Sequence, residues 1–303
     1  MIQEKIYLFI DASTKVLKGK EDKLKLVLCN TFAKGHTLIE DTPGVGKTTL
    51  VKLISKACRL ELSRIQFTND LLPSDILGVK IFNKETNEFN FHQGPIFGEL
   101  ILADELNRAT PKTQSALLQA MEEKKITLDG TTYPLPKFFT VMATQNPNSQ
   151  LGTFNLPESQ LDRFSLKIKM GHPNKEATLE MLKNSDIEDA LADFDQFLTH
   201  EEIFMAMEQI EKIHLEDNLY EIIYKLLDSS RKNESYIPLS NRAGLDMVKL
   251  SKSWAYFQKR DYVIPDDLKF LFPYVCGHRL VSPESSNIEL EHQLANEILA
   301  QLL

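Results

Sequence analysis

The segment Asp41-Thr-Pro-Gly-Val-Gly-Lys-Thr48 constrains this chain more than any other part of its sequence. It lies between a short apolar stretch, residues 35–40, and a stretch from Leu50 to Ala57 whose apolar residues recur with helical spacing. Glycines between a strand and a helix allow successive backbone N–H groups to wrap phosphates, and the helix dipole adds to the attraction. We therefore predict a phosphate-binding loop formed by Asp41, Thr42, Pro43, Gly44, Val45, Gly46, Lys47, Thr48 and Thr49.

Within this loop, each polar side chain has a distinct expected role. Lys47 would reach the outer phosphates, and the Thr48 hydroxyl would bind Mg²⁺. Asp41 stands where the pattern G-x-x-x-x-G-K-[ST] has its first glycine. We expect its carboxylate to point away from the phosphates and to accept hydrogen bonds from nearby backbone N–H groups, because phosphates would repel it.

A second acidic motif follows about 55 residues later, where Leu100-Ile-Leu-Ala-Asp104-Glu105 ends an apolar strand. Asp104 is a candidate magnesium ligand together with Thr48. Glu105 is a candidate general base that orients and deprotonates the attacking water. The alternative is a purely structural role, in which the acidic pair only caps a helix. An N-K-x-D motif for guanine is missing, because Asn83-Lys84-Glu85-Thr86 fails at its last position. The nucleotide is therefore expected to be ATP.

Three more residues are candidates for the same chemistry. Asn146 follows an apolar run in Ala143-Thr-Gln-Asn-Pro147 and could orient the water, although Asn-Pro alone more often marks a turn. Arg163 and Arg242 could stabilise charge that develops on the phosphates, although an isolated arginine is usually a solvated surface cation.

Strand-like and helical segments alternate through the first part of the chain. Five short apolar runs are expected to be strands, at residues 35–40, 62–67, 100–103, 138–144 and 166–170. This alternation predicts a parallel sheet covered on both faces. Residues 78–95 and 125–136 alternate around polar turns, as β-hairpins do. Beyond them the pattern becomes helical, so we predict an α/β core over residues 1–185 and a helical domain over 186–303.

Composition limits the partners and the compartment. With 42% hydrophobic and 26% charged residues, the chain resembles a soluble two-domain protein, and no apolar run is long enough for a membrane span. The N-terminus shows no signal-peptide pattern, and the three separated cysteines predict buried thiols rather than disulfides, so we expect a cytoplasmic protein. The net charge of −8 argues against nucleic acid as the main partner.

Several longer segments together resemble the MoxR group of AAA+ ATPases over nearly the whole chain. The most specific are Arg64-Ile-Gln-Phe-Thr-Asn-Asp-Leu-Leu-Pro-Ser-Asp75-Ile-Leu-Gly78, Gly94-Pro-Ile-Phe97, Leu102-Ala-Asp-Glu-Leu-Asn-Arg-Ala109, Gln114-Ser-Ala-Leu-Leu118 and Leu156-Pro-Glu-Ser-Gln-Leu-Asp-Arg-Phe164. The resemblance implies a five-stranded parallel sheet of order 5-1-4-3-2, inserted β-hairpins facing a central pore, and an all-α lid.

The same resemblance assigns roles to the remaining candidates. It implies that Asn146 is the first sensor, that Arg163 is an arginine finger reaching a neighbour's nucleotide, and that Arg242 is the second sensor. The motif around Arg242, Leu-Ser-Asn-Arg, departs from the family's small-residue pattern. The resemblance also implies a hexameric ring and a chaperone-like role in remodelling or maturing protein clients. The resemblance implies that this role extends to metal-cofactor insertion. It also implies a partner protein that carries a von Willebrand factor A domain.

Three other functions remain open at this stage. A nucleic-acid translocase of the same hairpin-insert clade would need basic hairpins, whereas here Lys80 and Lys84 are balanced by Glu85 and Glu88. A chelatase-type or gas-vesicle-type ATPase subunit would share the chemistry. A nucleotide-switched scaffold with little turnover would lack Glu105 or Asn146, and both are present.

Overall fold

The computed structural model describes residues 1–42, 44–146, 152–172, 175, 178–179, 187–192, 194–282 and 287–302. The first part of the chain contains α1 (Ile2–Ser13), α2 (Glu21–Phe32), β1 (Thr37–Glu40), α3 (Lys47–Cys58), β2 (Leu62–Gln66), α4 (Pro73–Leu77), β3 (Gly78–Asn83), β4 (Glu88–Gln93), η1 (Pro95–Phe97), β5 (Leu100–Asp104), η2 (Leu106–Arg108), α5 (Pro111–Glu123), β6 (Lys125–Leu128), β7 (Thr131–Pro134), β8 (Thr140–Gln145), α6 (Glu158–Leu161) and β9 (Leu166–Ile168). The second part contains α8 (Ile187–Ala192), α9 (His200–Glu211), α10 (Asp217–Lys232), α11 (Asn241–Phe257), α12 (Pro265–Cys276), η3 (Gly277–Arg279) and α13 (Ile288–Leu302).

The central sheet has five parallel strands in the order β2-β5-β8-β1-β9. When these five strands are numbered 1 to 5 in chain order and listed from the β9 edge, the order is 5-1-4-3-2, so the predicted topology is confirmed. The predicted last strand, residues 166–170, is too long. Its ladder stops at Ile168, because that residue pairs with Ile39 near the end of β1.

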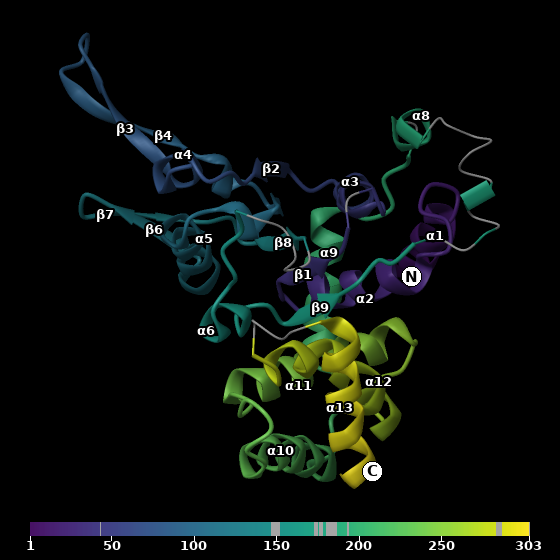
Figure 1. Cartoon of the computed structure of the whole chain (residues 1–303). Coiled ribbons are helices and arrows are strands. Elements are labelled where there is room, and N and C mark those ends of the chain that lie inside the picture. The colour runs from purple at the N-terminus through teal and green to yellow at the C-terminus, as the bar shows by residue number, and fades with distance from the viewer. Residues whose placement is uncertain are drawn as a thin grey trace.

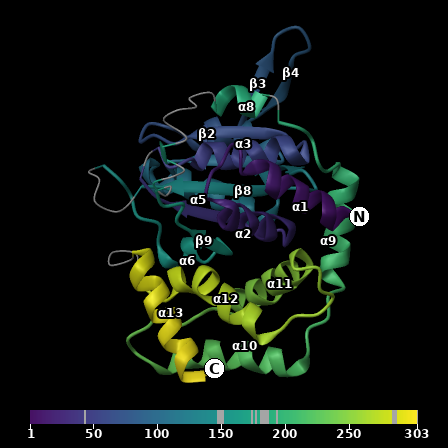
Figure 2. The same cartoon turned by 90° about the vertical axis from the view of Figure 1, so that its right-hand side faces the viewer.

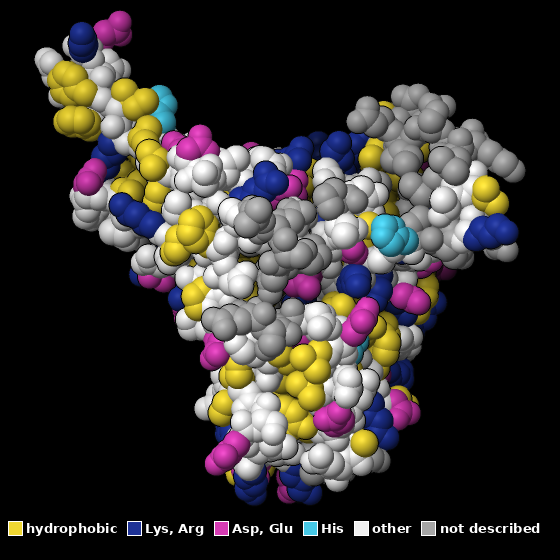
Figure 3. Space-filling view, in the orientation of Figure 1, with side chains coloured by type: hydrophobic (Ala, Val, Ile, Leu, Met, Phe, Trp, Pro, Cys, Tyr) yellow, Lys and Arg dark blue, Asp and Glu magenta, His cyan; other side chains and the backbone are white. Residues whose placement is uncertain are grey.

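Two β-hairpins leave this sheet, as predicted for residues 78–95 and 125–136. In the shorter hairpin, Asp129 and Gly130 have φ of 47° and 77°, the left-handed pair that a tight two-residue turn needs. The β3–β4 hairpin extends far from the body of the molecule (Figure 1). Apolar side chains gather on it (Figure 3), and Phe82 and Phe89 near its tip are 46% and 67% exposed.

Alternate residues of the strands face opposite sides of the sheet, and each side has its own hydrophobic core. Leu38 belongs to the core shared with α4 and α5, whereas its neighbour Ile39 belongs to the other. That second core continues without a break from α1, α2 and α3 into α9 to α13. The helical lid therefore shares a core with the α/β part, and the predicted boundary at 185 lies outside the described residues.

The lid packs beside β9, the edge strand (Figure 2). The Thr199 side chain accepts from the Glu202 N–H and the Glu202 side chain accepts from the Thr199 N–H, a capping box that begins α9. α2 joins the two parts, because the Ser253 hydroxyl of α11 donates to the main-chain oxygen of Cys29 at 2.7 Å. All three cysteines are buried free thiols, as predicted. Among the described residues, no helix is both long and apolar enough to cross a bilayer.

A buried ionic contact also links the lid to the sheet. The Lys167 ammonium on β9 lies 2.6 Å from the Glu291 carboxylate of α13 and 3.0 Å from that of Glu40 on β1. The side chains of Lys167 and Glu291 are only 2% and 1% exposed, so each charge depends on the other for its solvation.

Replacing Lys167 with Met should therefore destabilise the protein strongly, because Glu291 would keep a buried charge without its main partner. We expect a loss of about 3–5 kcal/mol of unfolding free energy, measured by urea denaturation. Lys232→Met is the control, since its pair with Asp228 lies at the surface of one helix and should contribute little to stability. Equal stability of the two variants would show that the buried contact does not hold the lid.

Candidate nucleotide site

The loop after β1 has the backbone conformation that a phosphate-binding turn requires. Gly44 and Gly46 have φ of 85° and 92°, in the left-handed region that disfavours any residue with a Cβ. α3 begins at Lys47, so its N-terminus opens directly onto the loop. Pro43, also predicted in the loop, lies outside the described residues. The N–H groups and the positive end of the helix dipole suit a phosphate chain.

The Lys47 side chain lies over this loop and is mostly buried. Its ammonium group donates to the main-chain oxygens of Asp41 at 2.6 Å and Thr42 at 3.3 Å. Burial lowers the pKa of this lysine, and the carboxylates of Asp41, Asp104 and Glu105 oppose that shift. The loop lysine therefore lies near enough to the acidic pair at the end of β5 to be influenced by its charge.

The Asp41 carboxylate is fixed by backbone N–H groups. One oxygen accepts from Thr42 at 2.8 Å, and the other accepts from Gly171, beyond β9, at 2.6 Å. Asp41 is 3% exposed. The expected arrangement, in which the carboxylate is held by backbone groups, is confirmed. The aspartate thereby ties the start of the loop to the segment that follows the edge strand.

Asp104 and Glu105 stand at the carboxyl end of β5. The Thr144 hydroxyl on neighbouring β8 donates to the Asp104 carboxylate at 2.7 Å and accepts from the Glu105 N–H at 2.9 Å. Arg64 on β2 contacts the other oxygen of Asp104 at 2.7 Å. Glu105 itself has φ of 56°, a left-handed conformation that a residue of this type holds only where its surroundings fix it.

The Glu105 side chain meets the predicted sensor. The Asn146 amide donates to one of its carboxylate oxygens at 3.4 Å, and the Gln66 amide donates to the other at 3.1 Å. Arg108 also lies 3.1 Å from this carboxylate. Asn146 is 3% exposed, and its main-chain oxygen accepts from Asn107 at 3.0 Å. The structure therefore brings the predicted base and the predicted water-orienting amide into contact.

Arg163 and Arg242 lie at a different place. Both contact the Glu122 carboxylate at the end of α5, at 3.0 Å and 2.5 Å. Arg163 precedes β9 by a few residues, so this cluster sits at the amino edge of the parallel sheet, whereas the loop and the acidic pair follow strands at its carboxyl edge. In one chain, the two arginines thus form a group of their own, apart from Lys47.

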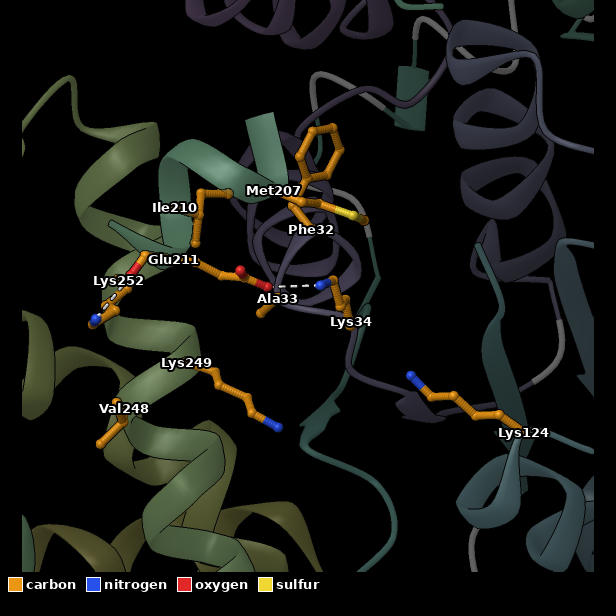
Figure 4. Close-up of a pocket in the computed structure, with 10 residues that line it drawn as sticks. All are labelled: Phe32, Ala33, Lys34, Lys124, Met207, Ile210, Glu211, Val248, Lys249 and Lys252. Atoms are coloured by element: carbon orange, nitrogen blue, oxygen red, sulfur yellow. Dashed lines mark hydrogen bonds and ion pairs between the residues drawn. The ribbon is translucent and has the colours of Figure 1, made fainter. Parts of the chain in front are cut away.

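Two adjoining cavities continue from these arginines between the core and the lid. The first, of about 310 Å³, is lined by Arg163 and Arg242 and shares Lys34, Lys124 and Lys249 with a second of about 260 Å³. In the second cavity, Lys124 and Lys249 extend towards each other from opposite walls (Figure 4). Burial, followed by the charges of Lys34 and Lys249, lowers the pKa of Lys124. This face is electropositive and suits an anion.

Some residues of the site lie in recognisable segments that do not reveal their individual roles. Thr144 lies in the same segment as Asn146, and Arg64 and Gln66 lie in a segment that carries the family resemblance. Their roles depend on strand register, which places Gln66 opposite Asp104. Arg279, in η3, contacts Asp162 beside Arg163 across 117 residues of sequence, and no local pattern indicates it.

Comparisons with known proteins agree with this geometry. The ATPase family associated with various cellular activities (AAA) matches residues 36–166, and the AAA lid domain matches residues 236–301. The uncharacterized protein YeaC of Bacillus subtilis is 40% identical over 92% of this chain and 88% of its own. Chaperone MoxR1 of Mycobacterium tuberculosis is 36% identical over 88% of this chain and 73% of its own. The crystal structure of a proposed ATPase from Cytophaga hutchinsonii aligns with a TM-score of 0.88 at 34% identity, covering 100% of this chain and 95% of the other.

The position of the Asp41 carboxylate leads to a prediction about nucleotide affinity. Because backbone groups already hold it, Asp41→Gly should change the Kd for ATP by less than about tenfold, or about 1.4 kcal/mol. The variant should also melt at a lower temperature, because it loses the hydrogen bonds that the Asp41 carboxylate accepts from Thr42 and Gly171 and because the unfolded chain gains entropy. Calorimetric titration with ATP and a thermal melt measure both effects. A glycine variant that bound ATP a hundredfold more tightly would identify Asp41 as a brake on nucleotide loading.

Proposed function

The chain belongs to the MoxR family of AAA+ ATPases, and we propose that it works as a ring in which each ATP site is completed by a neighbouring copy. It hydrolyses ATP to ADP and phosphate, as its family does. One observation carries the proposal. The phosphate loop, the acidic pair and Asn146 share one edge of the sheet, whereas Arg163 and Arg242 share the opposite edge.

Residues at the carboxyl edge have the chemistry for binding and for water activation. Glu105 would accept the proton of the attacking water, and Asn146, in contact with it, would hold that water in line with the terminal phosphate. Lys47 would leave the carbonyl oxygens of its loop to contact the phosphates. Binding and water activation do not need the arginine cluster. An arginine is needed only to stabilise the charge that develops on the transferred phosphoryl group.

Magnesium fits the side chains at this edge. Thr48 lies in the first turn of α3, and Asp104 ends β5 with its carboxylate braced by Thr144. A hydroxyl and a carboxylate are hard oxygen donors of the kind that Mg²⁺ takes, usually alongside phosphate oxygens and water. Bound there, the ion would neutralise phosphate charge, and Thr48 and Asp104 would hold it.

The electropositive edge supplies the complementary half. Arg163, Arg242 and the lysines lining the adjoining cavities present positive charge, whereas a bound triphosphate is strongly negative. Such complementarity favours the contact of one copy's amino edge with the next copy's nucleotide. A head-to-tail contact of this kind closes into a ring when the rotation between copies allows it. We propose six copies, in the cytoplasm.

For the cellular role, we propose chaperone-like remodelling or maturation of a protein client, including metal-cofactor insertion, with a von Willebrand factor A domain protein as partner. The relative named Chaperone MoxR1 supports the chaperone part. The exposed side chains of the β3–β4 hairpin include Ile81, Phe82 and Phe89, an apolar set that suits protein rather than a phosphate backbone.

Two substitutions separate binding from hydrolysis. Lys47→Ala should abolish ATP binding, because it removes a cation that contacts the phosphates in the ground state. Glu105→Gln should keep ATP bound and stop turnover, because only the step that needs a base is lost. Equilibrium binding of ATP and steady-state phosphate release measure the two effects. An equal loss of binding in both variants would contradict the assigned roles.

The arginine assignment is tested by mixing subunits. Arg163→Ala should bind ATP almost normally but lose about 10³-fold or more in hydrolysis rate. Arg163→Lys is the matched control, because it keeps the charge but loses the planar guanidinium, and it should remain impaired. Rings mixed from Arg163→Ala and Lys47→Ala copies should recover activity, since each supplies what the other lacks. Mixed rings with no recovery at any ratio would rule out action in trans.

A further inference from the structure

Two lid residues hold the backbone on both sides of Arg163. Arg279 donates to the main-chain oxygen of Asp162 at 2.9 Å, and the His278 imidazole contacts the main-chain oxygen of Phe164 at 3.0 Å. His278 and Arg279 are 1% and 6% exposed. The arginine that reaches the neighbour is therefore flanked by two carbonyl groups that bind adjacent residues of the lid.

The side chain of Asp162 strengthens this connection. Its carboxylate lies 2.9 Å from the Arg279 guanidinium and accepts from the Ser240 hydroxyl, the cap of α11, at 2.9 Å. Arg242, in the first turn of the same helix, lies 3.7 Å from it. Arg279 also binds Asp246 of α11 at 2.6 Å. The lid thus grips the Arg163 segment through η3 and through the start of α11.

Charge and burial restrict the geometry of this connection. The donors of a guanidinium have a fixed arrangement, and those of Arg279 bind Asp162, Asp246 and the main-chain oxygen of Val275 at 2.9 Å. Burial and the positive charges of Arg279 and Lys167 hold the pKa of His278 well below its usual range, so the imidazole is neutral and its Nε2–H can donate to the Phe164 carbonyl. Displacing the lid from the Arg163 segment would break the hydrogen bonds of Arg279 to Asp162 and of His278 to Phe164.

We propose that Arg279, assisted by His278, is a positioning residue that fixes Arg163 for the neighbouring copy, so that movement of the lid changes hydrolysis in the next subunit. This inference rests on the proposed action of Arg163 in trans. Arg279 does not touch nucleotide. It holds the peptide group that precedes Arg163, and His278 holds the carbonyl of Phe164, the residue that follows. Small misplacement of a catalytic group costs rate rather than substrate affinity.

Arg279→Gln should therefore lower kcat about tenfold or more while changing KM less than about threefold. Arg279→Lys, which keeps the charge near Asp162, should recover part of the loss. Glu291→Gln is the matched control, because it weakens the other buried tie between lid and sheet, at Lys167. It should lower the thermal midpoint without the tenfold fall in kcat.

Mixed rings distinguish positioning from a general structural role. Arg279→Gln copies mixed with Lys47→Ala copies should regain activity, because an intact arginine then meets an intact loop. Arg279→Gln mixed with Arg163→Ala should not rise above the residual rate of Arg279→Gln alone, because no interface then has a correctly placed arginine. The opposite pattern, recovery only in the second mixture, would overturn the inference, and so would a wild-type kcat in Arg279→Gln.

Failure of the premise would look different. If Arg163→Ala alone kept normal turnover, the proposed action of Arg163 on the neighbour's nucleotide would be wrong, whatever the result for the Arg279 variants. If Arg163→Ala were inactive and complemented in mixed rings but Arg279→Gln behaved like the wild type, the trans site would stand and only the role of Arg279 would be lost.

Discussion

The direction of the parallel strands is the constraint on which the rest of this molecule depends. All five strands of the sheet point the same way, so every loop that follows a strand opens at one edge and every loop that precedes a strand opens at the other. The phosphate loop and the acidic pair lie at the first edge. Arg163 and Glu122 lie at the second. No rotamer change can carry an arginine from one edge to the other, so a site that needs both must be shared between copies.

The lid is bound to this sheet in two ways. Apolar side chains of the lid helices continue the core formed by α1, α2 and α3, which makes the attachment broad. Polar contacts act at single points, and they include Lys167 with Glu291, Arg279 with Asp162 and Arg242 with Glu122. Hydrophobic packing is non-directional and tolerates small displacements, whereas charged hydrogen bonds depend on geometry. The second kind of contact is therefore the one through which a lid displacement would be felt at Arg163.

Much of this could be predicted from the sequence, because its signals are local. The glycines of the loop, the apolar runs of the strands and the alternating residues of the hairpins each act over a few residues, and these elements lie within about two residues of the predicted positions. The ladder ends were less accurate, since the partner strand decides where Lys169 and Met170 leave the sheet. The roles of Thr144 and Gln66 come from strand register. The role of Arg279 comes from a contact with a residue more than a hundred positions away. No local pattern encodes either. The grouping of Arg242 with Arg163 around Glu122 likewise became visible only in three dimensions.

The central claim is that one chain holds two halves of different sites. Sedimentation equilibrium and ATPase rates, measured on the same wild-type samples over a wide range of protein concentration, test it most directly. The account predicts that turnover per chain follows the fraction of chains in rings and vanishes for the monomer at saturating ATP. A monomer that hydrolysed ATP at the rate of the ring would contradict it.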